Sequence, residues 1–150
     1  MQTDDDVAAM VAAVMERFGR VDCVINNAGV GRIVDLRSID EAHFEQTLRT
    51  NLTSAFLVSQ EALPHMIAQS GGRLIFMSSL AARTGSLVSG AYAASEAGVE
   101  GLMHYYATYL RRHRVTANAI APALIASDIV TRMDLPPPDK LPFRQTVGGS

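Results

Sequence analysis

Three short apolar runs that alternate with longer helical patterns constrain the fold of this 150-residue chain most strongly. The apolar runs occupy residues 21–25, 73–78 and 115–121. The helical patterns, in which apolar side chains recur at helical spacing, occupy residues 3–18, 41–66 and 91–113. Helices that alternate with such strands are typical of a parallel sheet with right-handed crossovers, so we predict an α/β fold. Residues 1–150 are expected to form one domain with an irregular tail over about 134–150.

Several residues mark where these elements begin and end. Thr3 precedes three aspartates and suits a helix start, whereas Gly19 suits the end of the same helix. Ser38 and Glu41 fit a capping box in which Ser38 is the cap residue. The second helical pattern is expected to be interrupted near Asn51.

Composition and charge argue against several classes of function. A formal net charge of −2 offers no basic patch for nucleic acid. No apolar run approaches the ~18 residues that cross a bilayer, and the amino terminus lacks a signal-peptide pattern, so we expect a cytoplasmic protein. The single cysteine, Cys23, lies among apolar residues and is expected to be a small buried side chain. The four histidines show no metal-ligand spacing, so no metal site is predicted.

A serine and a tyrosine frame the segment that most suggests a reaction site. Ser79 follows the second apolar run, and Tyr92 stands where a long helix is expected to begin. Carboxyl ends of parallel strands and the starts of the following helices meet at one edge of a sheet, so both hydroxyls can reach one ligand oxygen there. This arrangement suits proton transfer to or from an oxygen atom. Taken alone, however, the two residues favour purely structural hydrogen bonds.

Five motifs occur in one order along the chain: Asn26-Asn-Ala-Gly29, Asn51, Ser79, Tyr92 and Asn118-Ala-Ile-Ala-Pro122. Each would be frequent by chance, but together, each on its expected element, they resemble the short-chain dehydrogenase/reductase family. Within that family, residues from Val7 to about Met133 are most similar to the 3-oxoacyl-acyl-carrier-protein reductase type. The resemblance implies a Rossmann-like sheet with flanking helices and an oxidoreductase that uses NAD or NADP. It also implies a small carbonyl or alcohol substrate and a homo-oligomer formed through the two long helices.

The resemblance further implies a role for each matching residue. Tyr92 would exchange the proton, Ser79 would hydrogen-bond the substrate oxygen, and Asn51 would hold a water in a proton relay. The residues implied in cofactor binding are Asn26, Ala28, Gly29, Pro122, Ile125 and Ser127. The first three would brace the sheet and shape the cofactor cleft, and the last three would belong to the loop that contacts the nicotinamide.

Glu96 departs from the family pattern at a decisive position. Four residues after the tyrosine the family has a lysine, which lowers the pKa of the phenol and holds the cofactor ribose. An anion one helical turn from Tyr92 should instead raise the pKa of that phenol. The only lysine of the chain, Lys140, lies in the proline-rich tail. In the simplest alternative interpretation, Glu96 is a solvated helix residue.

The glycine-rich turn with which the family binds pyrophosphate is absent from the sequence. We therefore expect the chain to begin just after the third strand of the family, without the amino-terminal cofactor-binding half. The edge of its first strand is then expected to be open to association. Three hypotheses stay open: an oxidoreductase that needs further residues for full function, a non-catalytic relative that binds or oligomerises, and an inactive fragment.

Overall fold

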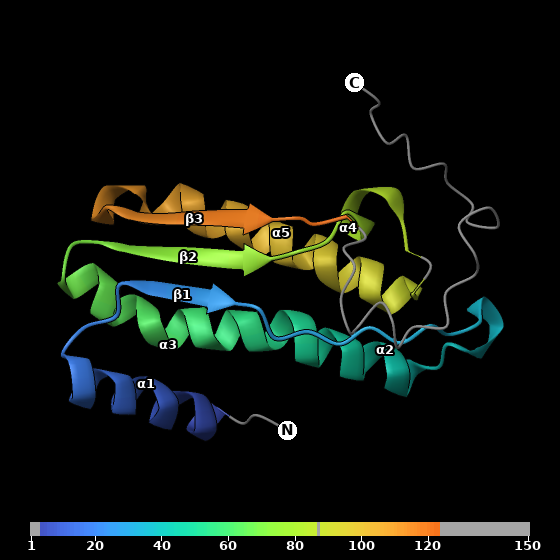
Figure 1. The fold of residues 1–150 in the computed structure, drawn as a ribbon, viewed down its shortest axis with the longest axis horizontal. Coiled ribbons are helices and arrows are strands. Elements are labelled where there is room, and N and C mark those ends of the chain that lie inside the picture. The colour runs from blue at the N-terminus through green and yellow to red at the C-terminus, as the bar shows by residue number, and fades with distance from the viewer. Residues whose placement is uncertain (1–3, 87, 124–150) are drawn as a thin grey trace.

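Figure 1 shows the computed structural model, which describes residues 4–86 and 88–123. The α-helices are α1 (Asp4–Phe18), α2 (Glu41–Leu48), α3 (Ser54–Ala68), α4 (Ala81–Thr84) and α5 (Gly90–Leu110). The strands are β1 (Cys23–Asn26), β2 (Gly72–Met77) and β3 (Val115–Ile120). Two 3-10 turns, η1 (Leu36–Ser38) and η3 (Arg111–His113), and one π-helical turn, η2 (Arg49–Thr53), complete the order.

The three strands form one parallel sheet in the order β1-β2-β3. Ile25 of β1 pairs with Ile75 of β2, which pairs in turn with Asn118 of β3. Each crossover contains a long helix, α3 in the first and α5 in the second (Figure 1). The predicted α/β, Rossmann-like architecture with a parallel sheet is therefore confirmed.

The hydrophobic core lies between the sheet and the two crossover helices, which cover the same face (Figure 1). Leu74 and Phe76 of β2 are fully buried there, together with Met66 of α3 and Tyr106 of α5. The rings of Phe76 and Tyr106 are stacked at 6.0 Å. Helix α1 packs alongside α3.

No helix of the described residues covers the other face of the sheet (Figure 1). Ile25 is 61% exposed and Ile120 is 51% exposed on that face. Because β1 is an edge strand, it also presents unpaired backbone groups, as expected from the sequence.

The prediction that Cys23 is buried was wrong. Cys23 is exposed, because it alternates with Val24 on the edge strand and points to the uncovered face with Ile25. Apolar neighbours in the sequence did not bury it, since burial here depends on a covering helix.

The predicted helix ends are confirmed at one place and corrected at another. Gly19 adopts φ +73° directly after α1, as the end of that helix requires. Asp40, and not Ser38, caps α2, because its side chain accepts the backbone N–H of His43 at 2.8 Å. Ser38 belongs to η1 instead. The predicted cap Thr3 lies outside the described residues.

Candidate active site

Two loops meet at the carboxyl edge of the sheet. The backbone N–H of Ser78 donates to the carbonyl of Ile120 at 2.8 Å, and that of Leu80 donates to the carbonyl of Pro122 at 3.0 Å. These bonds tie the segment after β2 to the segment after β3. Ser79 therefore lies on a fixed backbone, and its hydroxyl also accepts from the N–H of Ala81 at 3.2 Å.

Tyr92 lies in the first turn of α5, half-buried, at the same edge. Ser89 caps this helix and accepts the backbone N–H of Tyr92 at 3.1 Å. The Ser79 hydroxyl lies near enough to the Tyr92 phenol to stabilise its ionised form, so the structure brings together the two hydroxyls that the spacing predicted to meet. Burial raises the pKa of Tyr92, the charge of Glu96 raises it further, and the neighbouring Ser79 hydroxyl lowers it.

Asn51 occupies the π-helical turn η2, where the sequence predicted an interruption of the helix. It is 3% exposed, and its Oδ1 accepts the backbone N–H of Val30 at 2.8 Å. Its Nδ2 donates to the carbonyl of Val30 and to the hydroxyl of Ser95, both at 3.0 Å. Ser95 donates in turn to the carbonyl of Tyr92 at 2.8 Å. A chain of hydrogen bonds thus connects the loop after β1 to the start of α5.

Glu96 is buried, so its interpretation as a solvated helix residue was wrong. The side chain is 5% exposed, and its Oε1 accepts from Asn51 Nδ2 at 3.5 Å. Burial raises the pKa of Glu96 to about 7, while the hydrogen bond from Asn51 lowers it and the charge of Glu100 raises it. Within residues 4–86 and 88–123, no ion pair neutralises this carboxyl.

The residues that the resemblance implied in cofactor binding are spread along the same edge. Asn26 is turned into the core, where its Nδ2 donates to the hydroxyl of Ser59 on α3 at 3.1 Å. Ala28 and Gly29 are exposed in the loop after β1, and Pro122 is half-buried after β3. Ile125 and Ser127 lie outside the described residues.

The sequence reasoning missed three serines of this region. Ser89 directly precedes the start of α5, which is a common signal for a cap. Ser95 lies three residues after Tyr92, so helical phase places it on a neighbouring face. Ser78 donates to Oε1 of Glu100 at 3.3 Å. The contacts of Ser78 and Ser95 join residues far apart in the chain, and no sequence pattern announces such bonds.

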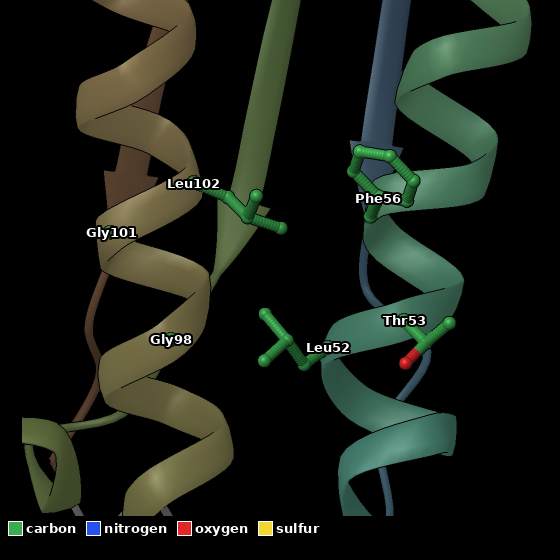
Figure 2. A pocket seen from close by; sticks show the side chains of 6 residues that line it. All are labelled: Leu52, Thr53, Phe56, Gly98, Gly101 and Leu102. Carbon is green, nitrogen blue, oxygen red and sulfur yellow. The ribbon is translucent and has the colours of Figure 1, made fainter.

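An open apolar cleft of about 420 Å³ lies away from these hydroxyls, between η2, the start of α3 and the middle of α5. Leu52 and Leu102 point toward one another across it from the two sides, with Phe56 at its upper end (Figure 2). Gly98 lacks the Cβ that would lie 2.7 Å from Leu52 Cδ2, so α5 can approach η2 closely here. The cleft has no titratable side chain in its lining and thus differs in kind from the Ser79–Tyr92 edge.

The described part of the chain contains no group of three or more potential metal ligands. It also contains no helix long and apolar enough to cross a membrane. Every buried side-chain nitrogen and oxygen in these residues has a hydrogen-bond partner.

The chain matches the model of the short chain dehydrogenases over residues 1–136. It belongs to the short chain dehydrogenase family. Among curated members, it is 37% identical over 125 residues to the 3-oxoacyl-acyl-carrier-protein reductase of Staphylococcus aureus, covering 83% of this chain and 51% of that protein. It is 32% identical over 129 residues to the sepiapterin reductase of Chlorobaculum tepidum, covering 86% of this chain and 53% of that protein. The chain thus spans about half the length of the curated relatives it matches.

Solved structures of short-chain enzymes share the fold. A metagenomic short-chain oxidoreductase in complex with NADP has a TM-score of 0.75 and 35% identity, covering 80% of this chain and 55% of that one. An NAD⁺-bound xylitol dehydrogenase has a TM-score of 0.81 and 28% identity, covering 85% of this chain and 50% of that one. The family resemblance carried by the five sequence motifs is therefore confirmed.

Proposed function

We propose that this short chain dehydrogenase carries the proton-exchanging part of an oxidoreductase that interconverts a ketone and a secondary alcohol with NAD or NADP. The proximity of the Tyr92 phenol and the Ser79 hydroxyl at the carboxyl edge of the sheet carries this proposal. The Staphylococcus aureus relative is named as a 3-oxoacyl-acyl-carrier-protein reductase, so a 3-oxoacyl thioester is the first substrate class to test.

The chemistry of ketone reduction explains why two hydroxyls are needed. Negative charge develops on the carbonyl oxygen as the carbonyl carbon is reduced, so a proton donor must lie within hydrogen-bond reach of that oxygen. In this proposal the Tyr92 phenol gives its proton to the oxygen, while the Ser79 hydroxyl donates a hydrogen bond that orients it. A nicotinamide cofactor supplies or accepts the hydride when it is bound.

The exposed loop after β1 supports binding of the nicotinamide end. Ala28 and Gly29 offer little side-chain volume there, and Pro122 follows β3 at the same edge, so we assign the nicotinamide ring to this edge. Within residues 4–86 and 88–123, no strand leads directly through a glycine-rich turn into a helix, so we assign the pyrophosphate to none of these residues. The role of Asn51 in a proton relay also stays a proposal.

Cofactor titration and kinetics test the proposal. The chain is titrated with NADH and NADPH by calorimetry, and nicotinamide absorbance is then followed with a 3-oxoacyl thioester. We expect Tyr92→Phe to lower the rate by about 100-fold or more, because general acid catalysis contributes about that much. The exposed Tyr109 of α5 provides a matched control, since Tyr109→Phe makes the same chemical change away from the edge. No binding of either cofactor at millimolar concentration would contradict an enzymatic role.

The substitution Glu96→Lys tests the charge beside Tyr92. In a chain completed to the length of its relatives, we expect turnover to rise at least about tenfold, because a cation in place of an anion lowers the pKa of a neighbouring phenol. Glu61 on α3 is exposed, so Glu61→Lys adds the same charge elsewhere and serves as the control. Equal rates for Glu96→Lys and the unchanged chain would show that Tyr92 is not the proton donor.

A second candidate function is a non-catalytic module that forms a homo-oligomer through α3 and α5. Aromatic side chains on this surface favour it: Phe56 is 40% exposed, Tyr105 is 52% exposed and Tyr109 is 61% exposed. The apolar cleft between the helices lies on the same surface (Figure 2). A sedimentation profile that stays monomeric at high protein concentration would contradict this candidate.

A further inference from the structure

A buried acidic side chain stands beside the proposed proton donor. Glu96 follows Tyr92 by one helical turn on the same side of α5, and it is only 5% exposed. Its Oε1 accepts a hydrogen bond from Asn51 at 3.5 Å. Val30 fixes this amide, because its N–H donates to Asn51 Oδ1 at 2.8 Å and its carbonyl accepts from the same Nδ2 at 3.0 Å. An element distant in sequence therefore fixes the place of the carboxyl.

The groups on α5 and β2 that face Glu96 do not neutralise it. Glu100, one turn further along α5, adds a like charge that raises the pKa of Glu96. Ser78, after β2, donates to the backbone carbonyl of Glu96 at 3.4 Å and not to its carboxyl. The nearest basic side chain from α4, Arg83, is paired with Oε2 of Glu100 at 3.2 Å.

The elements that pack on the other side of Glu96 form no ion pair with it among the described residues. From η2 the neighbour is the neutral amide of Asn51. From α2 the titratable neighbour is His43, whose Nε2 lies 3.5 Å from the Ser89 hydroxyl. Within the described ranges 4–86 and 88–123, the carboxyl of Glu96 therefore acts on Tyr92 with its charge uncompensated.

We propose that Glu96 is a positioning residue that keeps the Tyr92 phenol protonated, so that the site holds its exchangeable proton up to alkaline pH. This inference rests on the proposed function and says which residue controls the ionisation of its proton donor. In reduction, a hydride from a reduced nicotinamide adds to the carbonyl carbon, and the π electron pair moves to the oxygen. That oxygen takes the Tyr92 proton, and water then returns a proton to the phenolate.

Oxidation needs the phenolate before the reaction begins. Partial burial of Tyr92 and the charge of Glu96 both raise the pKa of the phenol, so its ionised form is rare at neutral pH. The carboxyl itself loses its proton at a pKa of about 7, so its charge is present at the alkaline pH where the phenol titrates. Removing that charge should therefore make Tyr92 more acidic.

Phenol ionisation can be measured in this chain without any turnover. The ultraviolet titration of the Tyr92→Phe variant, subtracted from that of the parent, isolates Tyr92 from the other three tyrosines. We expect Glu96→Gln to raise the ionisation constant of Tyr92 about threefold or more, and Glu96→Lys about tenfold or more. Glu61→Gln, on the exposed side of α3, should change it less than twofold. Incorporated fluorotyrosine, whose phenol is more acidic, gives the same comparison by fluorine NMR at a pH where the chain stays folded.

An ionisation constant of Tyr92 that is equal in the parent, Glu96→Gln and Glu96→Lys would overturn the proposal. In a chain completed to the length of its relatives, Glu96→Lys should move the pH profile of turnover towards lower pH by about one unit or more. An unchanged pH profile would overturn the assigned effect of Glu96 on the proton donor. Failure to bind a nicotinamide cofactor would refute the proposed function, whereas the phenol titration still decides the effect of Glu96 on Tyr92.

Discussion

Replacing Glu96 by glutamine should make the stability of the fold less dependent on pH. The substitution keeps the size of the side chain and an oxygen that can accept the bond from Asn51 Nδ2. It removes only the proton that the carboxyl gains or loses. The difference between the two proteins therefore reports the burial of this one ionisable group.

The pKa of Glu96 rises from its ordinary value of 4.5 to about 7 in the fold. Between these values the folded chain holds a proton that the unfolded chain has released, so the free energy of unfolding falls as pH rises through this window. The stabilisation that comes from this retained proton is complete below pH 4.5 and lost above about pH 7. At about 1.36 kcal/mol for each pH unit, the ceiling of the loss is about 3 kcal/mol. Solvent screening at the edge of the sheet lowers the expected loss to about 2 kcal/mol.

Urea unfolding followed by circular dichroism, at a series of pH values from 4.5 to 8, measures this loss. We expect Glu96→Gln and the parent to have similar stability at the acidic end. At the alkaline end Glu96→Gln should be the more stable protein by about 2 kcal/mol. Glu61→Gln, at an exposed position of α3, is the matched control. Parallel stability curves for the parent and Glu96→Gln would refute the burial of an ionisable carboxyl at this position.

Three further substitutions test the core, the contacts of Asn51 and the exposed surface of α5. Gly72→Ala places a Cβ 2.7 Å from Met66 Sδ in the core and should cost about 1–3 kcal/mol in urea unfolding, whereas Gly101→Ala, with open space around it, should not destabilise. Asn51→Ala removes two hydrogen bonds to the loop after β1 and should cost about 2–3 kcal/mol in the same assay; a loss below about 0.5 kcal/mol would contradict those bonds. Tyr109→Glu charges the exposed surface of α5 and should weaken self-association at least about tenfold in sedimentation experiments, with the unfolding free energy unchanged.

The type and order of the elements could be predicted because apolar spacing reflects burial directly. The third strand was expected over residues 115–121 and is found at Val115–Ile120. The uncovered face of the sheet could not be predicted, because it depends on α1 packing beside α3 and not across the sheet. Cys23 was misplaced for that reason, since its apolar neighbours say nothing about which helix covers them.

Some contacts of the candidate site could likewise be predicted from local sequence, whereas others depend on tertiary packing. Ser79 and Tyr92 meet because each stands at the end of an element whose position the periodicity predicts. The pattern around α2 favoured Ser38 as the cap, but the side chain of Asp40, directly before the helix, makes the bond. The bond from Asn51 to Ser95 spans 44 residues and arises only when η2 packs against α5. Such contacts depend on tertiary packing, which the spacing of residues in the sequence does not predict.

The placement of Tyr92 depends little on the residue at position 96. Asn51 is held by Val30 and Ser95, and Ser95 is in turn bonded to the carbonyl of Tyr92. Glu96 adds a single long bond of 3.5 Å to this chain of contacts, among those of the described residues. A change at position 96 therefore alters the charge beside the phenol while the surrounding geometry is kept. If Glu96→Lys leaves the unfolding free energy near that of Glu96→Gln but lowers the pKa of Tyr92 further, the scaffold and the electrostatics of this site are separable.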